Sequence, residues 1–298
     1  MKLVVAGRDF TSLCVGLTLE DNIYAASKVL CADIVFENHD GYLPPVFAYC
    51  GDQVVLSDGV EVFRGNVIEV EVMGKEGIFS ITAHEKSHLL ARNDVCGFFS
   101  TSCADNARKA VSQCGLECGD MPYKTCRSFA SYGGMTAKEV IDECYGEGYF
   151  VECDGSRVSV RKAGESEIAL SAGMIFSIRS EESIMEMVNE VSLTDSKHRV
   201  IYNTKSNSDI KKYGKYHKYR QISRNESGAA VAKAMLKGLV RRADIVMGGE
   251  LKVKKGSLVC FDLARYGLEG RYLIESVLHS VRDGVHLTEI GVKHESIL

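Results

Sequence analysis

The sequence has no tryptophan, only 3 prolines and no apolar run that approaches the length of a transmembrane helix. The scarcity of proline argues against a proline-rich linker, and the absence of tryptophan argues against a sugar-binding surface built from its rings. The N-terminus carries one lysine and an apolar run of only four residues before Gly7, which is shorter than the apolar core of a signal peptide. We therefore expect no membrane partner and a chain that folds in a cytoplasm.

A strong charge of either sign is also missing, because the formal net charge is −4 over 298 residues. No global basic field is therefore expected to recruit nucleic acid or an anionic membrane. The 11 cysteines are odd in number and irregularly spaced, which does not fit a secreted disulfide framework and indicates buried thiols in a reducing compartment. The length and the hydrophobic content of 45% are ordinary for a soluble protein of two or three domains.

The first third of the chain is rich in period-two patterns, which predict strands. Apolar and more polar residues alternate over residues 30–36, 68–72 and 79–83, and Asp58-Gly59 is a hairpin turn signal. In the second of these segments the isoleucine and the two valines are expected to share the dry face. Short strands joined by turns at this spacing indicate a small barrel or sandwich.

The middle third changes to helical periodicity. Residues 102–114 place apolar side chains on one helix face, and Thr136 with Glu139 forms a capping box for a second helix that Gly146 ends. A hairpin with its turn at residues 154–155 follows. Two helices and a hairpin predict a compact α+β module of about 70 residues.

The last third returns to strands and contains one helical segment. Residues 228–242 have apolar side chains at helical spacing, which predicts one helix over the whole segment. The segments expected to be strands are 257–263, 272–281 and 285–292, the last two joined by an Asp283-Gly284 turn.

One motif hints at an enzyme. His84-Glu85-Lys86-Ser87-His88 matches H-E-x-x-H, the pattern that places two zinc ligands one helical turn apart with a glutamate base between them. A zinc metallopeptidase that uses His84, Glu85 and His88 is therefore the alternative function.

Three features oppose this alternative. The motif needs a helix through both histidines, whereas the predicted strand 79–83 runs directly into it. Lys86 would place a cation beside the metal, and in the extended motif Ala91 and Asp94 stand where glycine and the third histidine would be. A distant third ligand such as Glu117 or Glu139 stays open. We expect the pattern to be accidental and the protein to hold no functional zinc.

A second candidate metal site is formed by cysteines. Cys114 and Cys118 have zinc-compatible spacing, and Cys103 and Cys126 lie nearby in the sequence. A structural zinc site usually has a second close pair of ligands, and none is present. We interpret these residues as thiols of a helix face and its loops.

The segment from Lys211 to Arg220 is basic and aromatic, as in platforms that bind single-stranded nucleic acid. A solvated edge strand uses the same residues, because lysine blocks edge-to-edge pairing. In an acidic chain we favour an edge strand or a subunit contact, and we expect no specific nucleic-acid partner.

The sequence also lacks a glycine-rich phosphate loop, a G-x-S-x-G nucleophile elbow and an obvious pair of catalytic carboxylates. We therefore assign no catalytic, cofactor-binding or metal-ligating residue, and we expect the protein not to be an enzyme.

Five short motifs follow one another over nearly the whole chain. They are Phe63-Arg64-Gly65-Asn66-Val67, Ile81-Thr82-Ala83-His84-Glu85-Lys86, Lys212-Tyr213-Gly214, Gly267–Ser276 and His279–His286. In this order they resemble the F-x-G-x-V, I-T-A-x-D-x, K-Y-G, G-L-x-G-x-Y-x-V-E and H-x-x-x-x-G-x-H segments of the XkdQ-like hub proteins of prophages and phage-tail-like particles. These proteins are relatives of the late control protein D family and of the baseplate hub of contractile tails. Glu85 stands where that family more often has aspartate.

The resemblance implies an α+β, β-rich fold with two small tube-type β-barrel domains and an α+β insert between them. The barrels would cover residues 1–90 and 171–298, the second with one helix, and the α+β domain residues 91–170. The resemblance also implies a homotrimer that joins the tail tube protein to the central spike protein among other baseplate proteins. Such a hub is made in the bacterial cytoplasm and assembled into the phage tail or tail-like particle, and its fold carries no catalysis and no cofactor.

Overall fold

The computed structural model describes residues 1–36, 48–74, 77–170, 172–223 and 227–294. The chain divides into two compact units. Unit 1 consists of Met1–Ile178, Asp244–Cys260 and Tyr272–Val292, and unit 2 of Arg179–Ala243, Phe261–Arg271 and Lys293–Leu298.

The elements in chain order are β1 (Lys2–Val5), β2 (Arg8–Asp9), β3 (Cys14–Asn22), β4 (Val29–Val35), β5 (Gln53–Asp58), β6 (Val60–Met73), β7 (Ile78–His84), the 3-10 helix η1 (Lys86–Ala91), β8 (Asp94–Phe99), α1 (Cys103–Gln113), β9 (Glu117–Cys118), β10 (Phe129–Thr136), α2 (Ala137–Tyr145), β11 (Tyr149–Asp154), β12 (Arg157–Lys162), β13 (Glu167–Ile168), η2 (Ala172–Met174), β14 (Ile175–Ser183), β15 (Glu190–Thr194), β16 (Val200–Lys205), α3 (Asn207–Tyr213), β17 (His217–Gln221), α4 (Gly228–Met235), β18 (Val240–Gly248), β19 (Leu258–Leu263), η3 (Ala264–Tyr266), β20 (Leu268–Arg282) and β21 (Val285–His294).

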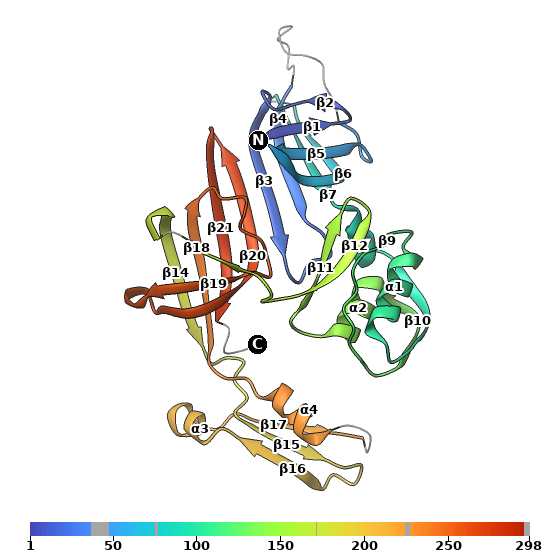
Figure 1. Ribbon diagram of the computed structural model, residues 1–298, viewed down its shortest axis with the longest axis vertical. Helices are drawn as coiled ribbons and strands as arrows, with labels where there is room; N and C mark the ends of the chain where they lie inside the picture. Colours follow the sequence, from blue (N-terminus) through green and yellow to red (C-terminus); the bar gives the residue numbers. More distant parts are fainter. Residues whose placement is uncertain (37–47, 75–76, 171, 224–226, 295–298) are drawn as a thin grey trace. The chain divides into compact units, whose positions relative to one another are not determined.

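One large sheet dominates the fold (Figure 1). In the described ranges its strands follow the order β14-β18-β21-β20-β3-β4-β7-β6-β5-β1-β2, and β19, which also pairs with β13, joins it through β20. Strands β3 and β20 pair antiparallel, with Gly16 opposite Arg282 and Asn22 opposite Ser276. The strand-rich N-terminal and C-terminal parts of the chain are therefore hydrogen-bonded to each other.

The N-terminal strands enclose an apolar core, as their period-two patterns predicted. Strands β4 and β7 pair antiparallel, so their inward side chains lie opposite one another. The buried cross-strand pairs are Leu30 with Ala83, Ala32 with Ile81, and Ile34 with Phe79. The strands predicted here are confirmed.

The prediction that the isoleucine and the two valines of residues 68–72 share the dry face of β6 is wrong in part. The pairing of β6 with β7 shifts between Val67 and Glu69, so Ile68 is an extra residue in a β-bulge. Val70 packs against the core, whereas Ile68 is 42% and Val72 53% exposed. The bulge changes which side chains point inward, and a period-two pattern does not reveal it.

The two helices and the hairpin predicted for the middle third are confirmed as α1, α2 and β11–β12 (Figure 1). Helix α1 begins after Ser102, whose hydroxyl accepts a hydrogen bond from the backbone of Asp105. Helix α2 has the predicted capping box of Thr136 and Glu139 and ends at Gly146, which adopts a φ of 66°. The apolar faces of both helices pack with β11 and β12 in one core.

Unit 2 contains a small sheet in the order β16-β15-β17, with α4 packed against it. Strand β15 pairs antiparallel with β16 and parallel with β17. The small core of unit 2 consists of Val188, Val191, Leu193, Ile222 and Ala232.

The prediction of a single helix over residues 228–242 is wrong for the second half of this segment. Helix α4 ends at Met235, and strand β18 begins at Val240. In β18 every second or third side chain is buried, including Ile245 and Met247. Pairing within the large sheet therefore overrides the local helical periodicity of this segment.

The basic segment is an edge strand only in its second half. Strand β17 is at one edge of the small sheet, as predicted. Lys211 and Lys212 instead belong to the last turn of α3, which Gly214 terminates with a φ of 87°. Glycine tolerates this left-handed conformation, which explains the K-Y-G motif as a helix end.

The β-rich α+β class is confirmed by these elements. The domain boundaries near residues 90 and 170 stay predictions. In the described ranges no helix has both the length and the apolar character needed to cross a bilayer.

Candidate functional site

The H-E-x-x-H segment lies at the end of a strand. His84 is the last residue of β7, and His88 belongs to the 3-10 helix η1. The strand predicted in front of the motif is therefore confirmed. The two histidines do not share the α-helical turn that the metallopeptidase motif requires.

Each histidine has a partner close by. Nδ1 of His84 lies 3.2 Å from the hydroxyl of Ser27, and Nδ1 of His88 lies 2.9 Å from the carbonyl oxygen of Glu85. The ring centroids of the two histidines are 5.8 Å apart. Burial lowers the pKa of His84, and the neighbouring His88 adds to the effect. In the described ranges no three histidine, cysteine or carboxylate side chains are grouped as a metal site.

Glu85 forms an ion pair with Lys28. Its Oε1 lies 3.4 Å from Nζ of Lys28, and its Oε2 accepts a hydrogen bond from the backbone N–H of Lys28 at 3.0 Å. Burial raises the pKa of Glu85. Burial would lower the pKa of Lys28, but the charges of Glu85 and Asp21 outweigh this effect and raise it. Glu85 is thus held by a cation and is not positioned as the base of a zinc site.

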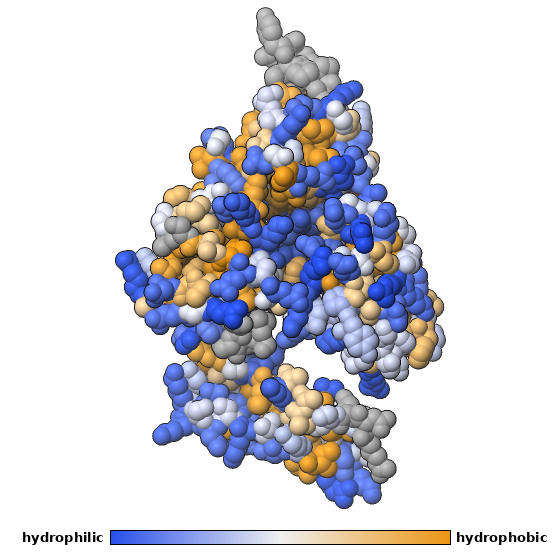
Figure 2. Space-filling view, viewed as in Figure 1, coloured by the Kyte–Doolittle hydropathy of each residue, from blue (hydrophilic) through white to orange (hydrophobic). Residues whose placement is uncertain are grey.

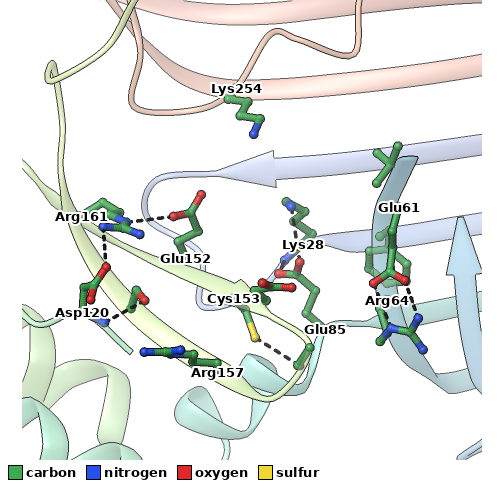
Figure 3. A pocket seen from close by; sticks show the side chains of 15 residues that line it. Lys28, Glu61, Arg64, Glu85, Asp120, Glu152, Cys153, Arg157, Arg161 and Lys254 are labelled. Atoms are coloured by element: carbon green, nitrogen blue, oxygen red, sulfur yellow. Dashed lines mark hydrogen bonds and ion pairs between the residues drawn. The ribbon is translucent and has the colours of Figure 1, made fainter. Parts of the chain in front are cut away.

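This ion pair lies at one wall of a charged cavity of about 450 Å³ in unit 1 (Figure 3). Its lining residues come from β6, the β11–β12 hairpin, the segment before β19 and the positions Lys28, Glu85 and Asp120. Its charged lining residues are Lys28, Glu61, Arg64, Glu85, Asp120, Glu152, Asp154, Arg157, Arg161 and Lys254. With five cations and five anions, the lining favours neither an anionic nor a cationic ligand.

Most of these charges are paired inside the cavity. The guanidinium of Arg161 lies between two carboxylates, 3.1 Å from Asp120 and 3.0 Å from Glu152 (Figure 3). Nε of Arg64 donates to Glu61 at 2.9 Å. The Lys28–Glu85 and Asp120–Arg161 pairs join separate segments of the chain, and none of these paired charges needs a ligand to be neutralised.

One possible nucleophile, Cys153, lines the cavity. Burial raises the pKa of its thiol, and Sγ donates to the carbonyl oxygen of Gly155 at 3.5 Å. A catalytic cysteine needs a lowered pKa, because the thiolate is the reactive form. The cavity therefore supports a structural interpretation better than a catalytic one.

The four cysteines considered as zinc ligands are not grouped as a metal site in the part of the chain that the structure describes. Cys103 and Cys126 lie beside Asn106 and the buried Cys144, where Asn106 Nδ2 is 3.4 Å from Sγ of Cys144 and 3.5 Å from Sγ of Cys126. Burial raises the pKa of Cys103 to about 11 and that of Cys144 to about 12, so these thiols stay protonated at neutral pH. Sγ of Cys118 instead contacts the carbonyl oxygen of Arg108 at 3.5 Å.

Sequence reasoning did not find the charged cavity. Its residues are scattered over more than 200 positions, from Lys28 to Lys254, and form no motif. The predicted hairpin gives a local signal for four of them, because Glu152 and Asp154 precede its turn, Arg157 and Arg161 follow it, and the hairpin brings them to adjacent strands. Asp120 and Lys254 carry no such signal.

Comparisons with known proteins agree with this structural picture. The sequence pattern of the YQBQ-like family matches residues 17–293. The fold is similar to that of the 43 kDa tail protein of prophage MuSo2 from Shewanella oneidensis, with a TM-score of 0.77 and 14% identity over 98% of this chain and 96% of that one. A tail protein from Neisseria meningitidis gives a TM-score of 0.74 and 12% identity over 99% and 96% of the two chains.

A third similar structure is the E. coli c3393 protein, a component of the type VI secretion system described as similar to the T4 tail proteins gp27 and gp5. It gives a TM-score of 0.59 and 9% identity over 98% of this chain and 76% of that one. No curated protein sequence matches the chain. The resemblance to phage-tail hub proteins is confirmed at the level of family and fold, since the chain belongs to the YQBQ-like family and has the fold of prophage tail proteins.

Proposed function

We propose that the protein is the baseplate hub of a contractile phage tail or phage-tail-like particle. The observation that supports this role is the fold similarity to a prophage tail protein over 98% of this chain and 96% of that one. In this proposal the chain is made in the bacterial cytoplasm, is assembled into the particle with other baseplate proteins, and joins the tail tube to the central spike. The role needs neither catalysis nor a cofactor. This agrees with a cavity in which most charged side chains are paired with one another.

The proposed assembly is a homotrimer. A tube built from rings of six must join a spike of threefold symmetry, and a chain with two similar strand-rich regions solves this mismatch because three chains present six quasi-equivalent faces. The pairing of β3 with β20 within unit 1 supports the proposal, because it joins strands of both regions by hydrogen bonds.

Cryo-electron microscopy of the intact particle tests this function. Three copies of the chain at the junction of tube and spike are expected. Six copies at that junction, or a particle that lacks the chain, would overturn the proposal.

A further inference from the structure

The two units of the chain carry formal charges of opposite sign. Unit 2 contains 17 of the 36 lysines and arginines but only 10 of the 40 aspartates and glutamates, so its formal charge is +7 and that of unit 1 is −11. These charges largely cancel in the net charge of −4. The overall composition therefore conceals a basic unit within an acidic chain.

The small sheet of unit 2 has one covered face and one open face. Val191 and Leu193 of β15 are fully buried on the side where α4 packs. Ser192, which lies between them in the strand, points to the other side. The register places Ser192 beside Asn203 of β16 and Tyr219 of β17 on that opposite face.

We call this surface the open face. It is formed by Ile201, Asn203, Lys205, Lys215, His217 and Tyr219. Ile201 is 54% and Tyr219 66% exposed, and Lys205 is exposed as well. Figure 2 shows hydrophobic patches among hydrophilic residues on unit 2. Ile201 and Tyr219 give the open face exposed apolar surface, and Lys205 gives it positive charge.

Polar contacts hold the side chains of the open face in place. Asn203 donates to the hydroxyl of Ser192 at 2.8 Å, and that hydroxyl lies 2.9 Å from Nε2 of His217. The ammonium of Lys215 lies 2.7 Å from the Glu190 carboxylate and holds the pKa of Glu190 below its ordinary value. The carboxylate on this face is thus already neutralised, and Lys205 adds an exposed positive charge.

We propose that the open face docks on the acidic unit 1 of a second copy of this chain. The −11 charge of unit 1 complements the +7 charge of unit 2, and such complementarity raises association rates and selects the partner. The exposed aliphatic side chain of Ile201 favours a protein partner over a nucleic acid, which binds through stacking and phosphate contacts. Contact between different surfaces of two copies is heterologous, and it closes into a ring when the rotation between copies allows.

This inference rests on the proposed homotrimer and names the surface that builds it. The test uses sedimentation analysis of the full-length protein at about 50 mM and about 500 mM salt, because screening weakens contacts between exposed charges. The open-face variant is Ile201→Asn combined with Lys205→Glu, so that only the lysine substitution changes the charge. The matched control is Lys233→Glu, an exposed lysine on α4 that removes the same positive charge from the other side of the small sheet.

The open-face variant should raise the dissociation constant of self-association by at least about tenfold at low salt, whereas the control should change it by less than about threefold. High salt should weaken the self-association of the wild type and reduce the difference in dissociation constant between the wild type and the open-face variant. Equal weakening by the control would overturn the inference, because the net charge of unit 2 alone would then explain the result.

Two further outcomes would also overturn it. One is a wild-type chain that stays monomeric at low salt up to its solubility limit. Three copies of such a chain at the tube–spike junction would still leave the hub function standing, whereas a particle without the chain would overturn that function. The other is an open-face variant that keeps self-association but loses binding to a single-stranded oligonucleotide, which would assign the face to a polyanion.

Discussion

Gly65 of β6 lies so close to the backbone of His84 that a Cβ added to it would be 2.3 Å from the His84 carbonyl oxygen. The same Cβ would lie 2.6 Å from the ring of Phe63. Both contacts are far shorter than a van der Waals separation. The glycine of the F-x-G-x-V motif therefore allows β6 to approach the end of β7, which is a packing role.

Gly65→Ala should destabilise unit 1 by about 2 kcal/mol, because the backbone of β7 must move to admit the methyl group. Urea unfolding measures the loss. Gly74→Ala is the control, since an added Cβ at Gly74 meets no atom within 4 Å. Equal stability of the Gly65 and Gly74 variants would contradict the close approach.

Lys28→Met should destabilise the protein by about 2 kcal/mol, because it leaves the carboxylate of Glu85 buried without its cation. The loss should be below the roughly 3–5 kcal/mol typical of a fully buried pair, since the side chain of Lys28 is 26% exposed. Removing the cation moves the folded-state pKa of Glu85 further above its unfolded value, so the loss should shrink at acid pH, where the carboxyl is protonated.

A double-mutant cycle provides the control for this pair. Lys28→Met combined with Glu85→Gln should be more stable than Lys28→Met alone, because no buried charge remains. Additive losses in the double variant would show that Lys28 and Glu85 do not interact.

Elemental analysis of protein purified without a chelator should find well below one zinc per chain. The reason is that Glu85 is engaged by Lys28 and that His84 and His88 do not share an α-helical turn. Stoichiometric zinc that disappears when both histidines are changed to alanine would restore the metallopeptidase alternative and refute the assignment of no metal ligand.

The stability of the protein should fall as the pH drops from about 6.5 to about 4, in part because of His279. Burial, with a smaller effect of His286, lowers the pKa of His279 from 6.5 to about 4. Nδ1 of His279 lies 3.1 Å from the hydroxyl of the buried Thr288. The unfolded chain binds more protons than the folded chain between these two values, so acid favours unfolding in this range.

For His279 alone, the loss between pH 7 and pH 5 should be about 2 kcal/mol. The urea midpoint of His279→Asn should therefore depend less on pH in this range than that of the wild type. Parallel pH profiles of the two proteins would show that His279 is not the titrating group.

Gly284→Val should destabilise the β20–β21 hairpin by about 2 kcal/mol. Asp283 and Gly284 have φ angles of 52° and 77°, which is the positive pair that the predicted two-residue turn requires. Asp283→Asn should be tolerated, because asparagine adopts a positive φ readily. Thermal unfolding distinguishes the two variants, and an unchanged melting temperature of Gly284→Val would show that the turn tolerates a branched side chain.

The sequence by itself determined those elements whose causes lie within a few residues. The capping box of Thr136 and Glu139 and the Asp283-Gly284 turn were predictable, because their hydrogen bonds and φ angles involve neighbours in the chain. The strands β4 and β7 were predictable as well, because one face of each is buried and the period of two is complete. The family resemblance was readable for a related reason, since its motifs mark helix ends, close approaches and turns.

The tertiary structure alone decided the features that depend on distant partners. Ile68 forms a bulge only because pairing with β7 sets the register of β6. The segment after Met235 forms a strand only because it pairs with other strands of the large sheet. The cavity around Arg161 joins residues as far apart as Lys28 and Lys254. No local pattern records such contacts, because their free energy arises when segments far apart in the chain meet.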